Sequence, residues 1–289
     1  MKSVEGILTD SGLIHGVIYF PPKPQTIREF LKCRKDIRAL NPDAAIYMVP
    51  RDMMRAVRDA CFFWSCGIYR IIGVPWSRDR RVPRVDLQTG YVEREAARLA
   101  RCLASLGTVD LNDLSFWDLR LQPHEVNTAN GKLLPLAGKE FIAVNVGGRA
   151  ASKNWGNENW LSLLRLISRR FSSLGLAFIG SADEFDRAKA LASVWPGETL
   201  NLCGALKPRE SAAVLKRALL FIGHDSGPMH LAAATGVRCV GIFGKFNKPK
   251  WFHPIGEGHR IIHNLQGIDK IAPGEVYDAV SLMLNKPCA

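Results

Sequence analysis

Short apolar runs alternate along the chain with longer segments in which apolar residues recur three or four positions apart. The first pattern is typical of buried strands, and the second of helices that bury one face. In the first part of the chain, these patterns predict strands at 13–20, 43–49 and 70–74 and helices at 26–40, 51–66 and 91–106.

A polar stretch at 122–140, with Pro, Asn and Gly, precedes a second series of the same kind. That series predicts strands at 141–147, 174–180, around Leu200, 219–223 and 238–243, and helices at 157–172, 183–195, 208–217, 227–235 and 273–285. Strands that alternate with helices predict parallel sheets, and therefore an α/β protein. The polar stretch predicts a boundary between two domains, residues 1–130 and 131–289.

The chain of 289 residues carries 39 Lys and Arg against 27 Asp and Glu, a formal net charge of +12. A basic surface favours anionic partners, which include nucleic acid, phosphorylated small molecules and anionic membranes. Because no nucleic-acid recognition motif accompanies the charge, we expect no nucleic acid as a partner. The seven cysteines form no CxxC pair, no signal peptide is visible, and no apolar run is long enough to span a bilayer. We therefore expect a cytoplasmic protein with reduced thiols.

The stretch HDSGPMHLAAATG places polar residues between a predicted strand at 219–223 and a predicted helix. Asp225 and Ser226 therefore stand at the carboxyl end of a strand and at a helix N-terminus, where anionic ligands bind in open α/β sheets. Gly227 allows a ligand to approach the backbone, and His230 follows about one turn later. The alternative is that Ser226 or Asp225 only caps the helix and that His230 is a core residue.

Two further stretches carry candidate chemistry. In VNVGGRAASK, Gly148 frees backbone amides, while Arg149 and Lys153 supply cations that suit a diphosphate leaving group; the alternative is a loop of solvated cations. In GSADEF, Glu184 follows a predicted strand and suits a ribose diol, unless it is only an acidic residue in a first helical turn. No His, Cys and acid set has the spacing of a metal site, so we expect neither a metal nor a cofactor.

The motifs GxxxSKxW…W, GSxDE and NLCGxLxPRESAAVLxxAxLFIGHDSGPMHLAAATG…VGIFG occur in this order within residues 140–255. In order and spacing they resemble glycosyltransferase family 9, the family of lipopolysaccharide heptosyltransferases. The resemblance implies a GT-B-like fold of two Rossmann-like domains with parallel sheets. It also implies a nucleotide-diphospho-sugar donor, with an ADP-sugar favoured, bound by residues 131–289, and an acceptor on the side of residues 1–130.

The resemblance also implies roles for single residues, with Lys153 and Asp225 as the two catalytic candidates. The implied donor-binding residues are Gly148, Arg149 and Lys153 near the diphosphate, Glu184 at the nucleoside, Leu206 by the base, and Asp225, Ser226, Gly227 and His230 around the phosphates or the donor sugar.

One part of the family pattern does not match. The family begins with a strand and a Gly-Asp loop that holds the acid acting as base, and nothing before the apolar run at 13–20 resembles them. We therefore expect the first domain to be incomplete.

The expected function is inverting transfer of a sugar, with heptose as one candidate, to a lipopolysaccharide core or related glycan at the inner face of the cytoplasmic membrane. The alternatives are a catalytically inactive nucleotide-sugar-binding fragment and, more weakly, a hydrolase that uses Asp225 and His230. The aromatic and basic segment 61–81 could contact an anionic membrane, or could be a core helix and strand followed by a solvated loop.

Overall fold

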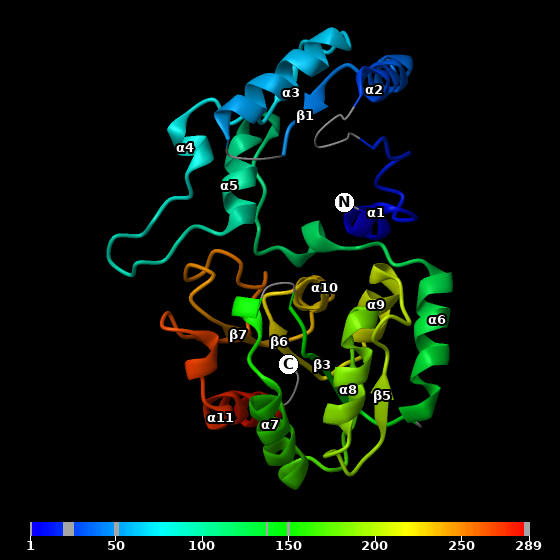
Figure 1. The fold of residues 1–289 in the computed structure, drawn as a ribbon, viewed down its shortest axis with the longest axis vertical. Helices are drawn as coiled ribbons and strands as arrows, with labels where there is room; N and C mark the ends of the chain where they lie inside the picture. The colour runs from blue at the N-terminus through cyan, green and yellow to red at the C-terminus, as the bar shows by residue number, and fades with distance from the viewer. Residues whose placement is uncertain (1, 20–25, 49–51, 137, 149–150, 286–289) are drawn as a thin grey trace. The chain divides into compact units, whose positions relative to one another are not determined.

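The computed structural model describes the chain except for residues 1, 20–25, 49–51, 137, 149–150 and 286–289. Contacts between residues divide the chain into two compact units (Figure 1). The larger unit joins residues 1–13 to residues 111–289, and the smaller unit is residues 14–110.

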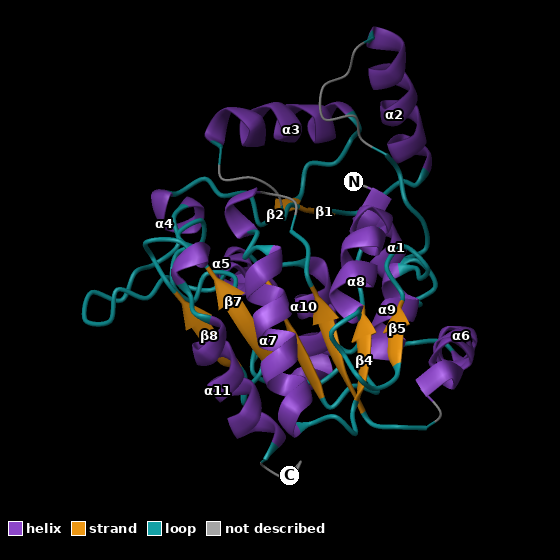
Figure 2. Cartoon of the chain, turned by 60° about the horizontal axis from the view of Figure 1, so that its bottom comes forward, coloured by secondary structure: helices purple, strands orange, loops and turns teal. Residues whose placement is uncertain are grey.

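The larger unit is built on a parallel sheet with the strand order β5-β4-β3-β6-β7-β8. Figure 2 shows these strands lying side by side. Their bounds are β3 Phe141–Asn145, β4 Gly175–Phe178, β5 Thr199–Asn201, β6 Leu220–His224, β7 Cys239–Phe243 and β8 Arg260–His263. Five of them confirm predicted strands, and β8 was not predicted. Numbered from β3, the order is 3-2-1-4-5-6, the order of a doubly wound nucleotide-binding fold.

Helices cover both faces of this sheet, because the side chains of each strand alternate between two buried clusters. In β3, Ile142 and Val144 join one cluster, whereas Phe141 and Ala143 join the other. The first face is covered by α7 Asn157–Arg170, α8 Phe185–Ala192 and α11 Pro273–Leu284, and the second by α6 Pro123–Leu133, α9 Pro208–Leu215 and α10 Gly227–Ala234.

Three of these helices begin with the same Pro-x-Glu pattern. Proline starts the helix with a fixed φ, and the glutamate two residues later accepts a hydrogen bond from the backbone N–H before the proline. The pairs are Pro123 with Glu125, Pro208 with Glu210 and Pro273 with Glu275. The start of each of these helices is therefore specified by residues that are adjacent in the sequence.

A buried ion pair ties α6 and the N-terminal helix α1 (Lys2–Leu8) to α9. Arg209 donates to both carboxylate oxygens of Glu125, at 2.5 and 3.0 Å, and each side chain is 4% exposed. Arg209 also donates to the backbone oxygens of Ile7, Leu119 and Arg120. The stretch 122–140 thus contains a packed helix, and the second division between the two compact units falls at 110/111. The domain boundary at 130/131 stays a prediction.

The described residues of the smaller unit form two short parallel strands, β1 Ala45–Ile46 and β2 Ile71–Ile72, and four α-helices, α2 Ile27–Ala39, α3 Met53–Ser65, α4 Arg78–Arg81 and α5 Glu95–Cys102. The side chains of Cys33, Phe62, Cys66 and Ile68 form a small core in which α2 meets α3. Around α5, Arg101 pairs with Glu93 at 2.5 Å. The strands predicted at 43–49 and 70–74 and the helices predicted at 26–40, 51–66 and 91–106 are present but shorter than predicted.

The predicted strand at 13–20 is wrong for its described residues, 13–19, which form neither strand nor helix. Asp10 and Gly12 adopt positive φ angles of 63° and 70°, and Leu13 and Tyr19 stay 49% and 57% exposed. No described strand pairs with this run, so its apolar pattern has no sheet to join. Within the part of the chain that the structure describes, no helix is both long and apolar enough to cross a membrane.

Candidate functional site

The loops that follow four strands of the larger sheet lie along one edge of that sheet. Strands β4, β3, β6 and β7 are neighbours in that order, and because they are parallel, their carboxyl ends meet at one edge. The helices after β3 and β6 cover opposite faces of the sheet. The crevice between two such strands is where open α/β sheets bind their ligands.

Lys153 and Asp225 meet at this crevice. Lys153 ends a short 3₁₀ helix after β3, and Asp225 follows β6. The Lys153 Nζ atom donates to Asp225 Oδ2 at 2.5 Å and lies 3.4 Å from the backbone oxygen of Asp225. The two side chains are 21% and 11% exposed, so the ion pair is largely shielded from solvent but still accessible to a ligand.

Asp225 has three side-chain partners among the described residues. Besides Lys153, its carboxylate lies 3.3 Å from His230 Nε2 and accepts a hydrogen bond from Asn247 Nδ2 at 2.6 Å. Burial by itself would raise the pKa of Asp225, but hydrogen bonds from these partners outweigh it and lower the pKa to about 2. The carboxylate is therefore ionised at neutral pH and can only accept hydrogen bonds.

The N-terminus of α10 begins beside this carboxylate. Ser226 stands at the N-cap position, but its side chain makes no capping hydrogen bond, and its Oγ atom is buried without a hydrogen-bond partner among the described residues. The predicted alternative, in which Ser226 acts as a side-chain cap, is therefore wrong. An added Cβ at Gly227 would meet no atom within 4 Å. The first N–H groups of α10 can accordingly receive an anion.

Glu184 ends the short helix after β4 and lies over two glycines. Its carboxylate accepts hydrogen bonds from Asn145 Nδ2 at 2.9 Å and from Ser181 Oγ at 3.3 Å. A side chain at Gly147 or Gly180 would collide with this carboxylate. Burial raises the pKa of Glu184 despite these hydrogen bonds. The two glycines thus make room for an acid at the carboxyl ends of β3 and β4.

A buried histidine joins the two halves of the site. His224 Nδ1 lies 3.2 Å from the backbone oxygen of Gly147, and its ring packs edge-on to Trp160. Burial lowers the pKa of His224 to about 4, so it is neutral at physiological pH. It fixes the position of the glycine that lies against Glu184.

Besides Glu184, Ser226 and Gly227, whose positions are given above, the predicted site residues divide into three groups. Lys153, Asp225 and His230 are in direct contact, and an added Cβ at Gly148 would lie 3.1 Å from the Lys153 side chain. Arg149 lies outside the described residues. Leu206 packs partly buried against the second core cluster, where none of these polar contacts reaches it.

Sequence reasoning missed four residues of the site. Asn145 and His224 end the buried strands β3 and β6. Asn145 lies inside the apolar run predicted as the strand 141–147, whereas His224 follows the predicted strand 219–223 and receives no role from the sequence. Phe246 and Asn247 follow β7, and Phe246 places its ring 4.9 Å from Lys153 Nζ. A position at the carboxyl end of a strand of a parallel sheet, or in the loop that follows it, was the available signal for all four.

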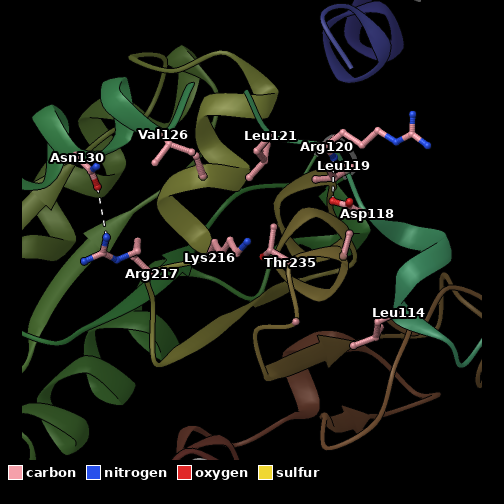
Figure 3. A pocket seen from close by; sticks show the side chains of 13 residues that line it. Leu114, Asp118, Leu119, Arg120, Leu121, Val126, Asn130, Lys216, Arg217 and Thr235 are labelled. Atoms are coloured by element: carbon pink, nitrogen blue, oxygen red, sulfur yellow. Dashed lines mark hydrogen bonds between the residues drawn. The ribbon is translucent and has the colours of Figure 1, made fainter. Parts of the chain in front are cut away.

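The larger unit also has a pocket of about 620 Å³ away from these residues (Figure 3). Leu119, Leu121 and Val126 line it, and Arg217 donates to Asn130 at its rim. It lies at the C-terminal ends of α9 and α10, whereas Asp225 and Ser226 lie at the N-terminus of α10. No cluster of three or more metal-ligating side chains occurs among the described residues.

Comparisons of sequence place the chain among known proteins. A model of the family described as Glycosyltransferase family 9 (heptosyltransferase) matches residues 31–272. Lipopolysaccharide heptosyltransferase 3 of Escherichia coli K12 is 26% identical over 112 residues. That alignment covers 38% of this chain and about a third of the relative, 33% of its length.

Solved structures share the fold at low sequence identity. A family 9 glycosyl transferase from Veillonella parvula has a TM-score of 0.71 at 16% identity, covering 98% of this chain and 86% of that one. The E. coli heptosyltransferase WaaC with ADP has a TM-score of 0.63 at 18% identity, covering 91% and 79%. These likenesses confirm the predicted GT-B-like α/β fold. The expected incompleteness of the first domain stays a prediction.

Proposed function

Because the chain belongs to glycosyltransferase family 9, the heptosyltransferase family, we propose that it transfers a sugar from a nucleotide-diphospho-sugar to a lipopolysaccharide-core or related glycan. Heptose is the first sugar to test. The observation that carries this proposal is the Lys153–Asp225 pair, which stands at the carboxyl ends of β3 and β6 beside the free N-terminus of α10.

The donor is proposed to lie along the carboxyl edge of the sheet. Its diphosphate would contact Lys153, the backbone at Gly148 and the first N–H groups of α10, because these groups offer a cation and unpaired donors. Glu184 would accept hydrogen bonds from the ribose diol, since its carboxylate lies at the end of β4. The likeness to a heptosyltransferase solved with ADP supports an ADP-sugar.

The remaining family assignments stay proposals. Ser226 and Gly227 would approach the phosphates, because one has a buried hydroxyl without a partner and the other has open space around it. Leu206 by the base and Arg149 near the diphosphate rest on the family resemblance. Residues 131–289 form the proposed donor side, and residues 1–130 the acceptor side.

The proposed chemistry is a single displacement with inversion. An acceptor hydroxyl attacks the anomeric carbon, a new C–O bond forms, and the bond to the diphosphate oxygen breaks. The hydroxyl proton passes to a carboxylate base. Negative charge grows on the leaving diphosphate, so a fixed cation at Lys153 stabilises the transition state more than the ground state.

The experiment that tests donor binding is a thermal-shift titration against ADP, UDP, GDP and CDP. A ligand at 100 times its dissociation constant should stabilise the fold by about 2.7 kcal/mol. Selective stabilisation by ADP is the expected result. No shift with any of the four nucleotides would contradict the proposed donor site.

Transfer is tested separately, with ADP-heptose and a lipopolysaccharide-core acceptor. Acceptor-dependent release of ADP is the result expected of a transferase. Binding of ADP without release would identify the nucleotide-sugar-binding protein that the sequence leaves open. Release of ADP without any acceptor would favour hydrolysis, for which the contact of His230 with Asp225 supplies a pair of acid–base groups.

Contact with the inner face of the cytoplasmic membrane is a further part of the proposal. In segment 61–81, Trp64, Tyr69 and Trp76 are 47%, 80% and 46% exposed, and the basic helix α4 follows them. Exposed aromatic rings beside arginines suit an anionic membrane surface. Co-sedimentation with vesicles that contain or lack anionic phospholipid tests this contact.

A further inference from the structure

Asn247 has a buried side-chain amide that uses its nitrogen atom, but not its oxygen atom, in a hydrogen bond to a described residue. The residue is 3% exposed, and its Nδ2 atom donates to Asp225 Oδ2 at 2.6 Å. Its Oδ1 atom is buried and has no hydrogen-bond partner among the described residues. Because Oδ1 and Nδ2 share one carbon atom, Oδ1 lies within about 5 Å of the Asp225 carboxylate.

The chemistry of these atoms restricts what can complete the pairing. An amide oxygen accepts hydrogen bonds and cannot donate them. An ionised diphosphate also only accepts, so it cannot satisfy Asn247 Oδ1. A hydroxyl can, and buried polar atoms in proteins nearly always find a partner. Asp225 likewise presents only acceptors at neutral pH.

The site therefore has two parts of opposite character. Lys153 and the N-terminus of α10 offer donors and positive charge, which suit phosphate oxygens. Asp225 and Asn247 offer acceptors, which suit the hydroxyl groups of a sugar. The two parts adjoin at the Lys153–Asp225 ion pair. This arrangement suits a ligand in which a sugar is bonded directly to a diphosphate.

We propose that Asn247 is a specificity-determining residue for the donor sugar, whose Oδ1 atom accepts a hydrogen bond from a sugar hydroxyl close to the diphosphate. The inference rests on the proposed function and deepens it. Through Nδ2, the same side chain holds the Asp225 carboxylate in place. A site that pairs with a hydroxyl rejects the analogue that lacks it, because its own acceptor is then left buried and unpaired.

The competing interpretation gives Asn247 a positioning role only, through its hydrogen bond to Asp225. Titration calorimetry with ADP, ADP-heptose and the monodeoxy ADP-heptoses separates the two. The variants are Asn247→Ala and Asn247→Ser, the second keeping a polar group if the first does not fold. Asn264→Ala is the matched control, since its Oδ1 atom accepts from the backbone of Gln266 in the loop after β8.

We expect the wild-type chain to bind one monodeoxy ADP-heptose about tenfold more weakly than ADP-heptose. Asn247→Ala should bind ADP-heptose and this monodeoxy analogue with equal affinity, and should bind ADP as the wild type does. The control Asn264→Ala should discriminate between the two sugars as the wild type does. The proposal would be overturned if both Asn247 variants lost affinity for ADP and for ADP-heptose equally. It would also be overturned if the Asn247 variants discriminated among the monodeoxy ADP-heptoses as the wild type does. If the wild-type chain binds no ADP, the proposed function fails first, and this inference fails with it.

Discussion

The Nζ atom of Lys153 lies 2.5 Å from Oδ2 of Asp225, although 72 residues separate the two in the chain. The contact exists because β3 and β6 are neighbours in the sheet while β4 and β5 lie beyond β3. It also means that the cation proposed for the donor diphosphate already has an anionic partner. A diphosphate must therefore share Lys153 with Asp225, or take its place.

Replacement of Lys153 by Ala should weaken ADP binding by about 10- to 100-fold, because a charge-assisted hydrogen bond to phosphate is lost. Calorimetric titration measures the effect. Lys139→Ala is the matched control, since Lys139 also pairs with a carboxylate, Glu198, but at an exposed position of the larger unit. Unchanged ADP affinity in Lys153→Ala would remove the diphosphate role from this residue.

Replacement of Gly147 by Ala should displace Glu184, because the new Cβ would occupy the space of the Glu184 carboxylate. The carboxylate is the flexible end of a side chain, so we expect it to move with little loss of folding stability. If Glu184 binds the ribose, ADP affinity should fall about tenfold, while affinity for inorganic diphosphate stays unchanged.

The control for that substitution is Gly131→Ala, because an added Cβ at Gly131 meets no atom within 4 Å. It should leave both affinities as they are. Equal weakening of ADP and diphosphate by Gly147→Ala would show that the substitution disturbs the loop after β3 as a whole, and would contradict a separate nucleoside role for Glu184.

The sequence was informative where local rules decide the structure. Short apolar runs predicted five of the six strands of the larger sheet, and the carboxyl-end rule predicted that Lys153, Glu184 and Asp225 stand in ligand-binding loops. The helix α6 was missed because its sequence, PHEVNTANGKL, is polar and has little apolar periodicity. Its position depends on the ion pair between Glu125 and Arg209, which are 84 residues apart.

Pairing between distant residues explains the other differences. The run LIHGVIYF has the composition of a strand, yet a strand forms only beside a neighbouring strand, and no described strand pairs with residues 13–19. Asn247 stands in the loop after β7, and its contact with Asp225 follows from the order of β6 and β7. Neither fact can be read from residue spacing.

The buried His224 should make folding stability depend on pH below neutrality. Its pKa is lowered from the ordinary 6.5 to about 4 in the folded chain, so between these values the unfolded chain binds more protons. Stability is therefore fully present above about pH 6.5 and falls by about 3 kcal/mol as the pH drops to 4. Urea denaturation across this range measures the slope.

The variant His224→Phe keeps a ring against Trp160 but cannot titrate, so most of that slope should disappear. It should also cost about 1 kcal/mol at neutral pH, because the hydrogen bond to Gly147 is lost. His15→Phe removes an exposed imidazole from the smaller unit and serves as the control. An unchanged slope in His224→Phe would show that other groups cause the acid sensitivity.

The ion pair between Arg209 and Glu125 should be among the most sensitive points of the larger unit. Both side chains are 4% exposed, so replacing one partner leaves the other charge buried and unpaired. Glu125→Gln or Arg209→Met should lower the free energy of unfolding by about 3 to 5 kcal/mol, measured by urea denaturation. Lys139→Ala, which breaks an exposed pair, should cost about 0 to 1 kcal/mol.

The double variant Glu125→Leu with Arg209→Met distinguishes two origins of that cost. If it came only from an unpaired buried charge, removing both charges would restore the wild-type stability. Arg209 also donates to the backbone oxygens of Ile7, Leu119 and Arg120, and these oxygens would lose their partner. We therefore expect partial recovery, with about 1 to 3 kcal/mol of the loss remaining. Full recovery would mean that α1 and the segment before α6 are held by apolar packing alone.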